Sequence, residues 1–280
     1  MKQHMPDLDF SRPQVMAIVN VTPDSFYAPS RTPDREAIEA RIRRVAAEGA
    51  AIIDIGGYSS RPGADEVDPD EELRRVLLGT EAARRLAPAI PVSIDTFRAS
   101  VAEEVIRCCG PVIVNDISAG ELDGALPETA ARYDVPYIAM HMKGDPQSMQ
   151  SLTDYRQDIV TEVVNYFVRR VAELQQIGIR PGNIILDPGF GFAKTLEQNY
   201  ELLAGLHELC VSGYPVLAGV SRKSMIYKLL GTTPDGALAG SVALGWECLR
   251  QGASILRVHD VREAVDTVRL FGTFKRCGCR

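Results

Sequence analysis

The chain has 280 residues, which is long enough for two ordinary domains or for one large α/β barrel. Hydrophobic residues make up 45% and charged residues 24%, as is usual for a globular protein. The net charge of −6 argues against nucleic acid or an anionic membrane as the main partner, although a cleft can still attract small anions. The sequence has no apolar run long enough to span a bilayer and no signal-peptide core, so we expect a cytoplasmic protein that binds no membrane. The six cysteines lack clear metal-ligand spacing and are expected to be reduced thiols.

Eight apolar runs along the chain predict buried β-strands. They cover residues 15–20, 51–57, 91–96, 111–116, 136–142, 183–189, 215–221 and 254–260. Stretches with helical periodicity and charged faces lie between them, for example residues 34–48, 70–86, 154–177 and 236–250.

Eight strand–helix units without a linker predict a single-domain (β/α)8 TIM barrel over residues 1–280. Residues 1–13 are expected to be a lead-in and residues 273–280 a tail. An open, doubly wound sheet is the alternative. Such a sheet would more naturally have a Gly-rich turn after the first strand, where this chain instead reads "NVTPDSF".

Every predicted strand ends in hydrogen-bonding or ionisable side chains. In a TIM barrel the carboxyl ends of the strands meet at one mouth, where the βα loops form the active site. Any one of these residues would most often cap a helix or bond to a neighbouring loop, but together they predict a functional site. The residues are Asn20, Asp54, Asp95, Asn115, Asp116, His141, Asp187, Ser221, Arg222, Lys223, Arg257 and His259.

Three cationic or ionisable side chains indicate an anion site. Lys223, Arg257 and His259 follow the seventh and eighth strands, where TIM barrels often bind phosphate. Asn20 could supply a neutral oxygen to Mg²⁺ held against phosphate oxygens, because Mg²⁺ commonly takes few protein ligands. These residues predict a phosphorylated substrate.

A second group of side chains favours a planar heterocycle. Asp95, Asn115 and Asp187 can all accept hydrogen bonds, and a carboxylate can pair in bidentate fashion with a guanidine-like ring edge. The Gly- and Pro-bounded loop "GGYSSRPG" adds Arg61, which can bind a carboxylate or a phosphate.

The motifs "NVTPDSF", "SSRPGA", "SIDT", "NDI", "MHMKG", "DPGFGF", "SRKS" and "RVHD" follow one another across nearly the whole chain. In this order, one per strand, they resemble the dihydropteroate synthases, a family of pterin-binding enzymes. The resemblance implies a transferase of folate biosynthesis that joins 6-hydroxymethyl-7,8-dihydropterin diphosphate to 4-aminobenzoate and releases diphosphate. It also implies a Mg²⁺-dependent barrel, usually a homodimer, that is the target of sulfonamides.

By the same resemblance, individual residues acquire roles. Asp95, Asn115 and Asp187 correspond to the pterin-binding set, with Lys223 beside the ring. Arg257 and His259 correspond to the diphosphate-binding pair, and Asn20 to the asparagine linked to Mg²⁺ and the diphosphate.

The loops acquire roles in the same way. Ser60 and Arg61 correspond to the 4-aminobenzoate loop, with Ser224 in the same region. Of these residues, Lys223, Asp95, Arg61 and Arg257 are the expected catalytic set. The expected lid over the site consists of Thr22, Pro23, Asp24, Ser25 and Phe26.

Two alternatives remain within the pterin-binding class. A methyltetrahydrofolate-binding methyltransferase domain would have no need of "SRPGA", Lys223 or the Arg257–His259 pair. A catalytically silent paralogue should have lost diphosphate or loop residues, and none is lost. An unrelated sugar-phosphate barrel would explain the anion site but not the three acceptors.

The chain also departs from the family pattern in two places. It reads "YAPSRT" where many members have "SDGG", and Tyr58 stands where Glu is common. These departures bear on loop dynamics and drug response.

Overall fold

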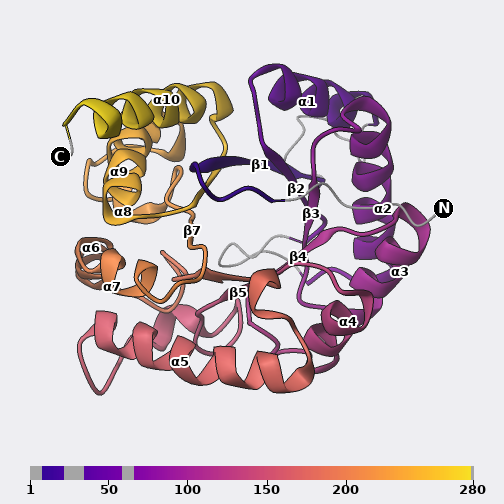
Figure 1. Ribbon diagram of the computed structural model, residues 1–280, viewed down its shortest axis with the longest axis horizontal. Helices are drawn as coiled ribbons and strands as arrows, with labels where there is room; N and C mark the ends of the chain where they lie inside the picture. Colours follow the sequence, from indigo (N-terminus) through magenta and orange to yellow (C-terminus); the bar gives the residue numbers. More distant parts are fainter. Residues whose placement is uncertain (1–7, 22–34, 59–65, 279–280) are drawn as a thin grey trace.

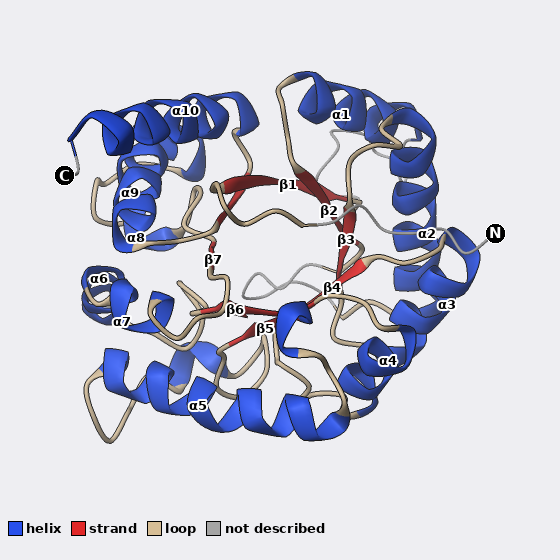
Figure 2. Cartoon of the chain, in the orientation of Figure 1, coloured by secondary structure: helices blue, strands red, loops and turns tan. Residues whose placement is uncertain are grey.

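The computed structural model describes residues 8–21, 35–58 and 66–278. Eight strands form the centre of the molecule and helices surround them (Figures 1 and 2). The strands are β1 (Gln14–Asn20), β2 (Ile52–Gly56), β3 (Val92–Asp95), β4 (Ile113–Asp116), β5 (Tyr137–Met140), β6 (Ile184–Asp187), β7 (Leu217–Ala218) and β8 (Ile255–Val258). The eight predicted strands are therefore confirmed.

The α-helices cover the outside of the strands. They are α1 (Arg35–Ala47), α2 (Pro69–Leu86), α3 (Ala99–Cys109), α4 (Ala125–Tyr133), α5 (Ile159–Ile177), α6 (Leu196–Ala204), α7 (Leu206–Cys210), α8 (Ser224–Tyr227), α9 (Leu238–Gln251) and α10 (Val261–Gly278). Short 3-10 helices are η2 (Met149–Ser151), η3 (Pro181–Asn183) and η4 (Pro234–Ala237).

The strands are parallel and curl into a barrel. Their order is β6-β5-β4-β3-β2-β1-β8-β7, so each strand lies beside its neighbours in sequence and β1 meets β8. A parallel bridge between Leu186 and Val216 brings β6 to the start of β7. The predicted (β/α)8 TIM barrel is thus correct, and the open sheet is not formed.

The barrel is packed with side chains at one end. Met16, Ile52 and Ile113 belong to a cluster of large apolar residues that point inward from seven of the strands; the others are Ile138, Ile185, Leu217 and Ile255. Leu8 and Phe10, which precede β1, pack against this cluster. They close the amino-terminal end of the barrel, and the predicted site residues lie toward the carboxyl end.

Side-chain caps set the first residue of some helices. Asp158 accepts a hydrogen bond from the backbone of Thr161, so α5 begins at Ile159 and not at residue 154 as the periodicity predicts. Thr195 and Gln198 form a reciprocal capping box at the start of α6.

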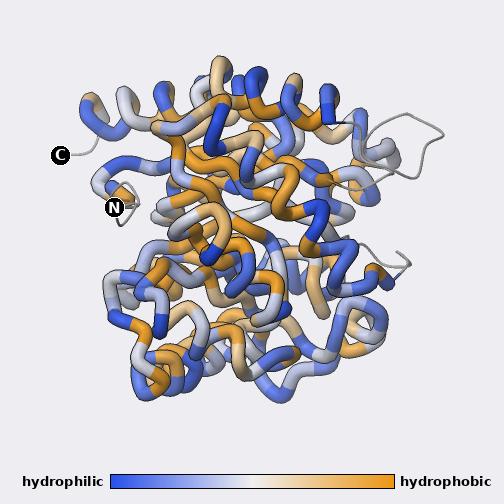
Figure 3. The backbone as a smooth tube through the Cα atoms, turned by 90° about the vertical axis from the view of Figure 1, so that its right-hand side faces the viewer, coloured by the Kyte–Doolittle hydropathy of each residue, from blue (hydrophilic) through white to orange (hydrophobic). Residues whose placement is uncertain are grey.

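The outer helices alternate between hydrophobic and hydrophilic residues along their length (Figure 3). That alternation is typical of helices with one face on a sheet and the other in water. The last of them, α10, continues to Gly278, through most of the stretch expected to be a tail. No described helix combines the length and the apolar character that a membrane span requires.

Gly79 offers a test of helix–sheet packing. A Cβ added to this α2 residue would lie 2.6 Å from Cγ2 of Ile55 and 3.1 Å from Cγ2 of Val21. We expect Gly79→Ala to lower the denaturant midpoint. Overpacking destabilises a core by about 1–3 kcal/mol, whereas the better helix propensity of Ala stabilises the helix by only about 1 kcal/mol.

Gly124→Ala is the matched control, because no atom lies within 4 Å of its added Cβ. We expect this control to stay within about 0.5 kcal/mol of the parent chain. Equal stability of the two variants would contradict the packing described for α2.

Candidate active site

The carboxyl ends of the strands bring an arginine and two carboxylates together. Nε of Arg257, on β8, lies 2.7 Å from Oδ2 of Asp54 on β2. Nη2 of Arg257 lies 2.6 Å from the same oxygen and 2.6 Å from Oδ2 of Asp95, the last residue of β3. The Asp54 side chain is fully buried, whereas those of Arg257 and Asp95 are 20% and 17% exposed. One guanidinium therefore joins three strands.

Two carboxamides extend this cluster. Asn115, on β4, is buried and donates from Nδ2 to Oδ2 of Asp54 over 3.2 Å. Asn20 ends β1 and pairs in register with Gly56. A Cβ at Gly56 would lie 3.4 Å from Oδ1 of Asn20 and 3.7 Å from Cβ of Asp95. The glycine therefore leaves room for Asn20 beside Asp95.

Asp187 and Lys223 form the other side of the candidate site. Asp187 ends β6, is buried, and accepts a hydrogen bond of 2.8 Å from the backbone N–H of Gly189. Nζ of Lys223 donates to the carbonyl of Phe190 and lies 4.8 Å from the ring centroid of Phe192. Asp187 and Lys223 also influence each other electrostatically.

Burial shifts the titration of these groups. It raises the pKa of Asp95 to about 7; the neighbouring charge of Asp54 adds to this rise and that of Arg257 opposes it. Burial also raises the pKa of Asp187, against the effect of Lys223. The pKa of Lys223 is lowered to about 8, again mainly by burial. Several groups with shifted pKa values in one barrel mouth are typical of a functional site.

The segments after β7 and β8 hold further predicted residues near one another. Arg222 has a φ of +55° and forms two bonds of 2.8 Å with Asp260, so its charge is already paired. Lys223, by contrast, directs its Nζ at the loop after β6. The backbone N–H of His259 donates to Ser221 Oγ over 3.1 Å, and Ser224 begins α8.

An apolar cluster stands among the loops at the same end of the barrel. Its members follow β3, β4, β5 and β6 in sequence or end those strands, and a flat ring could pack against them. They are Ile117, Met140, Met142, Met149 and Ala193, with Phe97 and Phe192 packed alongside. Residue type alone did not identify this cluster as part of a site.

Several predicted residues lie outside the described part of the chain. They are the lid residues Thr22, Pro23, Asp24, Ser25 and Phe26 and the loop residues Ser60 and Arg61. Tyr58, at the edge of the second segment, packs edge-on against Phe97 with ring centroids 5.2 Å apart. The guanidinium of Arg98 lies over both rings and pairs with the buried Glu72.

Sequence reasoning named His141 but missed Lys194, its buried partner behind the site. Nζ of Lys194 lies 3.0 Å from Nδ1 of His141 and donates to the carbonyls of Gly189 and Phe192 over 2.9 and 3.0 Å. A Cβ at Gly189, where φ is +70°, would lie only 2.1 Å from the His141 carbonyl. Lys194 thus fastens the loop after β6 onto the end of β5. The lysine that ends the run "GFGFAK" is the sequence feature that could have indicated this buried contact.

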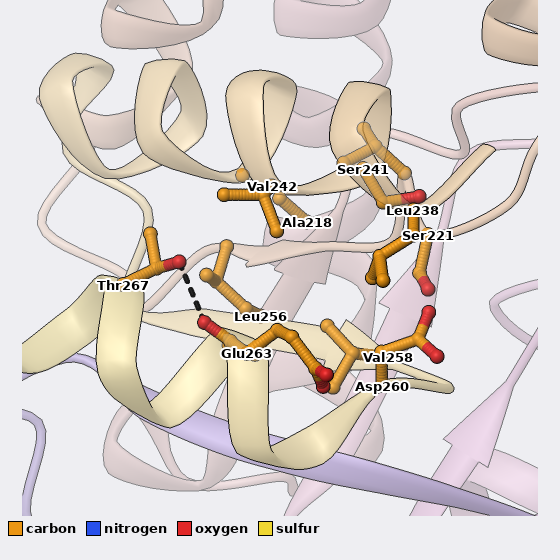
Figure 4. Close-up of a pocket in the computed structure, with 13 residues that line it drawn as sticks. Ala218, Ser221, Leu238, Ser241, Val242, Leu256, Val258, Asp260, Glu263 and Thr267 are labelled. Carbon is orange, nitrogen blue, oxygen red and sulfur yellow. Dashed lines mark hydrogen bonds between the residues drawn. The ribbon is translucent and has the colours of Figure 1, made fainter.

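A separate cavity lies between α9 and α10, behind β7 and β8 (Figure 4). Its volume of about 20 Å³ leaves room for about one water molecule. Val242, Leu256 and Val258 line it, and Thr267 bonds to the Glu263 carbonyl at its edge. This cavity is too small for a substrate. The cluster of Arg257, Asp54 and Asp95 at the carboxyl ends of the strands instead assigns the site to the barrel mouth.

Comparison with known proteins agrees with this assignment. A family model described as "Pterin binding enzyme" matches residues 16–259. The dihydropteroate synthase of Haemophilus influenzae is 42% identical over 94% of both chains. That of Escherichia coli is 44% identical over 94% of this chain and 92% of its own.

Solved structures give the same result. The Yersinia pestis dihydropteroate synthase with a sulfonamide drug complex has a TM-score of 0.89 at 39% identity, covering 99% of this chain and 100% of its own. The Xanthomonas albilineans enzyme with 4-aminobenzoic acid has a TM-score of 0.85 at 40% identity. The same enzyme in complex with 7,8-dihydropteroate has a TM-score of 0.84 at 38% identity. The two Xanthomonas matches each cover 96% of this chain and 95% of that one. The chain therefore belongs to the dihydropteroate synthase family of pterin-binding enzymes.

Proposed function

We propose that this chain joins 6-hydroxymethyl-7,8-dihydropterin diphosphate to 4-aminobenzoate, giving 7,8-dihydropteroate and diphosphate in folate biosynthesis. One observation carries the proposal: acceptors from β3, β4 and β6, two of them buried, share a mouth with Lys223 and Arg257. Complexes of Xanthomonas albilineans dihydropteroate synthase with 4-aminobenzoic acid and with 7,8-dihydropteroate support this substrate and this product.

Asp95, Asn115 and Asp187 bind the pterin in this proposal. Its amino group and ring N–H groups are planar donors, and these three side chains offer acceptors. Asp187 keeps Oδ2 for the ligand because Gly189 already bonds to Oδ1. The apolar cluster around Met140 and Phe192 covers the faces of the ring.

Lys223, Arg257 and His259 bind the diphosphate. The bond from the pterin methylene carbon to the diphosphate oxygen breaks, and these groups stabilise the negative charge that develops there. The amine of 4-aminobenzoate then attacks the electron-poor carbon and loses a proton. An arylamine is neutral at pH 7, so no nucleophilic Ser or Cys is needed.

A magnesium ion fits this mouth through Asn20. The carboxamide oxygen is a hard ligand, and it lies beside the pterin and diphosphate residues. Among the described residues no group of three His, Cys, Asp or Glu side chains could hold a metal ion. Asn20 would therefore hold Mg²⁺ together with diphosphate oxygens and water, and the ion would neutralise leaving-group charge.

The 4-aminobenzoate site is proposed to consist of Ser60, Arg61 and Ser224. Arg61 would pair with the carboxylate of the substrate. Residues 22–26 would close over the bound pterin and exclude water from the reacting carbon. Sulfonamides would compete at this site, in keeping with the sulfonamide complex of the Yersinia pestis enzyme.

We further propose a cytoplasmic homodimer. Leu270 and Phe274 are exposed on α10, and the Phe274 ring lies 5.7 Å from that of Trp246 on α9. This apolar face is suited to a second copy of the chain. The described cysteines are all free thiols, as expected in a reducing compartment.

A coupled assay for diphosphate release tests the proposed reaction. With Mg²⁺ and the pterin diphosphate, we expect release that depends on 4-aminobenzoate, with 7,8-dihydropteroate formed in equal amount. A folded protein that releases no diphosphate with both substrates present would refute the proposal.

The lowered pKa of Lys223 predicts a pH dependence. Below about pH 8 its amine is protonated and can bind diphosphate, and above that pH the charge is lost. We expect kcat/KM for the pterin diphosphate to fall as the pH rises from 8 to 9.5, because this ratio reports groups of the free enzyme.

Lys223→Arg is the comparison variant. Its guanidinium keeps its proton throughout this range, so a slower but flat alkaline profile is expected. The same decline in the variant would mean that another group causes it.

A further inference from the structure

Asp54 is a buried carboxylate inside the barrel to which none of the roles above has been assigned. Its neighbours on β2, Ile53 and Ile55, point outward into the main apolar core, so Asp54 points inward above Ile52. The residue is 0% exposed. An ionised side chain in such a place is costly unless it is paired.

The partners of Asp54 are two residues of the proposed substrate site. Its Oδ2 accepts from Nδ2 of Asn115 and from Nε of Arg257, and it also lies 2.6 Å from Nη2 of that arginine. These partners come from β4 and β8, on opposite sides of β2 in the strand order. One oxygen therefore links the proposed pterin and diphosphate halves of the site.

The chemistry of a carboxylate fixes the orientation of Asn115. An ionised carboxylate can only accept hydrogen bonds, so the amide nitrogen of Asn115 must face it. The amide oxygen of Asn115 is then turned away from Asp54 and can accept a pterin N–H. If the amide flipped, it would present a donor to the ligand instead.

The same carboxylate holds one edge of Arg257. Nε and Nη2 of the guanidinium are directed to Asp54, and Nη2 also reaches Asp95. Within the described part of the chain, Nη1 makes no hydrogen bond, so it can donate to an anion. The other oxygen of Asp54, Oδ1, is buried and has no hydrogen-bond partner among the described residues. The protein thus keeps a buried carboxylate of which only one oxygen is hydrogen-bonded within the described residues.

We propose that Asp54 is a positioning residue, which turns the Asn115 amide and the Arg257 guanidinium toward the pterin and the diphosphate. The inference rests on the proposed function and extends it to a residue that need not touch substrate.

The test compares binding of 6-hydroxymethyl-7,8-dihydropterin by calorimetry in four proteins: the parent chain, Asp54→Asn, Asn115→Ala and the double variant. The bare pterin is the probe because it reports the Asn115 half of the site without the diphosphate. We expect Asp54→Asn to weaken binding about 10- to 100-fold, as loss of hydrogen bonds to a charged group would. In the Asn115→Ala background the same change should weaken pterin binding less than about twofold, because the amide that Asp54 orients is gone.

Thr80→Val is the matched control. Thr80 on α2 is also fully buried, and its hydroxyl also lacks a partner among the described residues. We expect pterin affinity to be unchanged in this variant. If Asp54→Asn does not fold, Asp54→Ser, which removes the charge and keeps an acceptor, takes its place in the cycle.

An unchanged pterin affinity in the folded Asp54 variant would overturn the inference. Equal losses in the presence and absence of the Asn115 amide would also overturn it, because Asp54 would then act on the site only through the fold. Failure of the parent chain to bind pterin or to form dihydropteroate would instead refute the proposed function. The two failures are therefore distinguishable.

Discussion

The pairing of buried charges at one end of the barrel is the constraint on which the candidate site depends. Arg257 lies between Asp54 and Asp95, and Lys223 lies near Asp187. Each charge would be expensive in this environment without its neighbour, and removing a single partner leaves the other uncompensated. The mouth therefore suits the proposed substrate, which would bring planar donors to the carboxylates and negative charge to the cations.

The barrel makes this pairing possible because its two ends differ. The apolar cluster around Ile52 and Ile113 fills the amino-terminal end, so the polar residues of the mouth lie directly above packed apolar side chains. The low local dielectric strengthens every interaction above it. It also shifts the pKa of Asp95 upward and that of Lys223 downward, so both lie closer to neutral pH.

Much of the fold could be predicted from the sequence, because a strand buried on both faces leaves a continuous apolar run that ends abruptly in a polar residue. Asn20, Asp95 and Asp187 each mark such an end. Side-chain partners could not be predicted in the same way. The bonds of Arg257 to Asp54 and of Lys194 to His141 join residues that are distant in sequence, and no local pattern records them. The helix start at Ile159 was missed because a cap overrode the periodicity.

The central claim is that the mouth binds a pterin through its buried acceptors, and Asp187→Asn tests it most directly. The variant is close to isosteric, and its amide oxygen can still accept from Gly189, whereas its NH₂ group would face the ligand. Calorimetry with 6-hydroxymethyl-7,8-dihydropterin should show a binding free energy less favourable by about 2–4 kcal/mol. The reason is that a charge-assisted hydrogen bond is lost and the NH₂ group of the variant faces a pterin N–H, so that two donors oppose each other. Parent-like affinity in a folded Asp187→Asn protein would contradict the account.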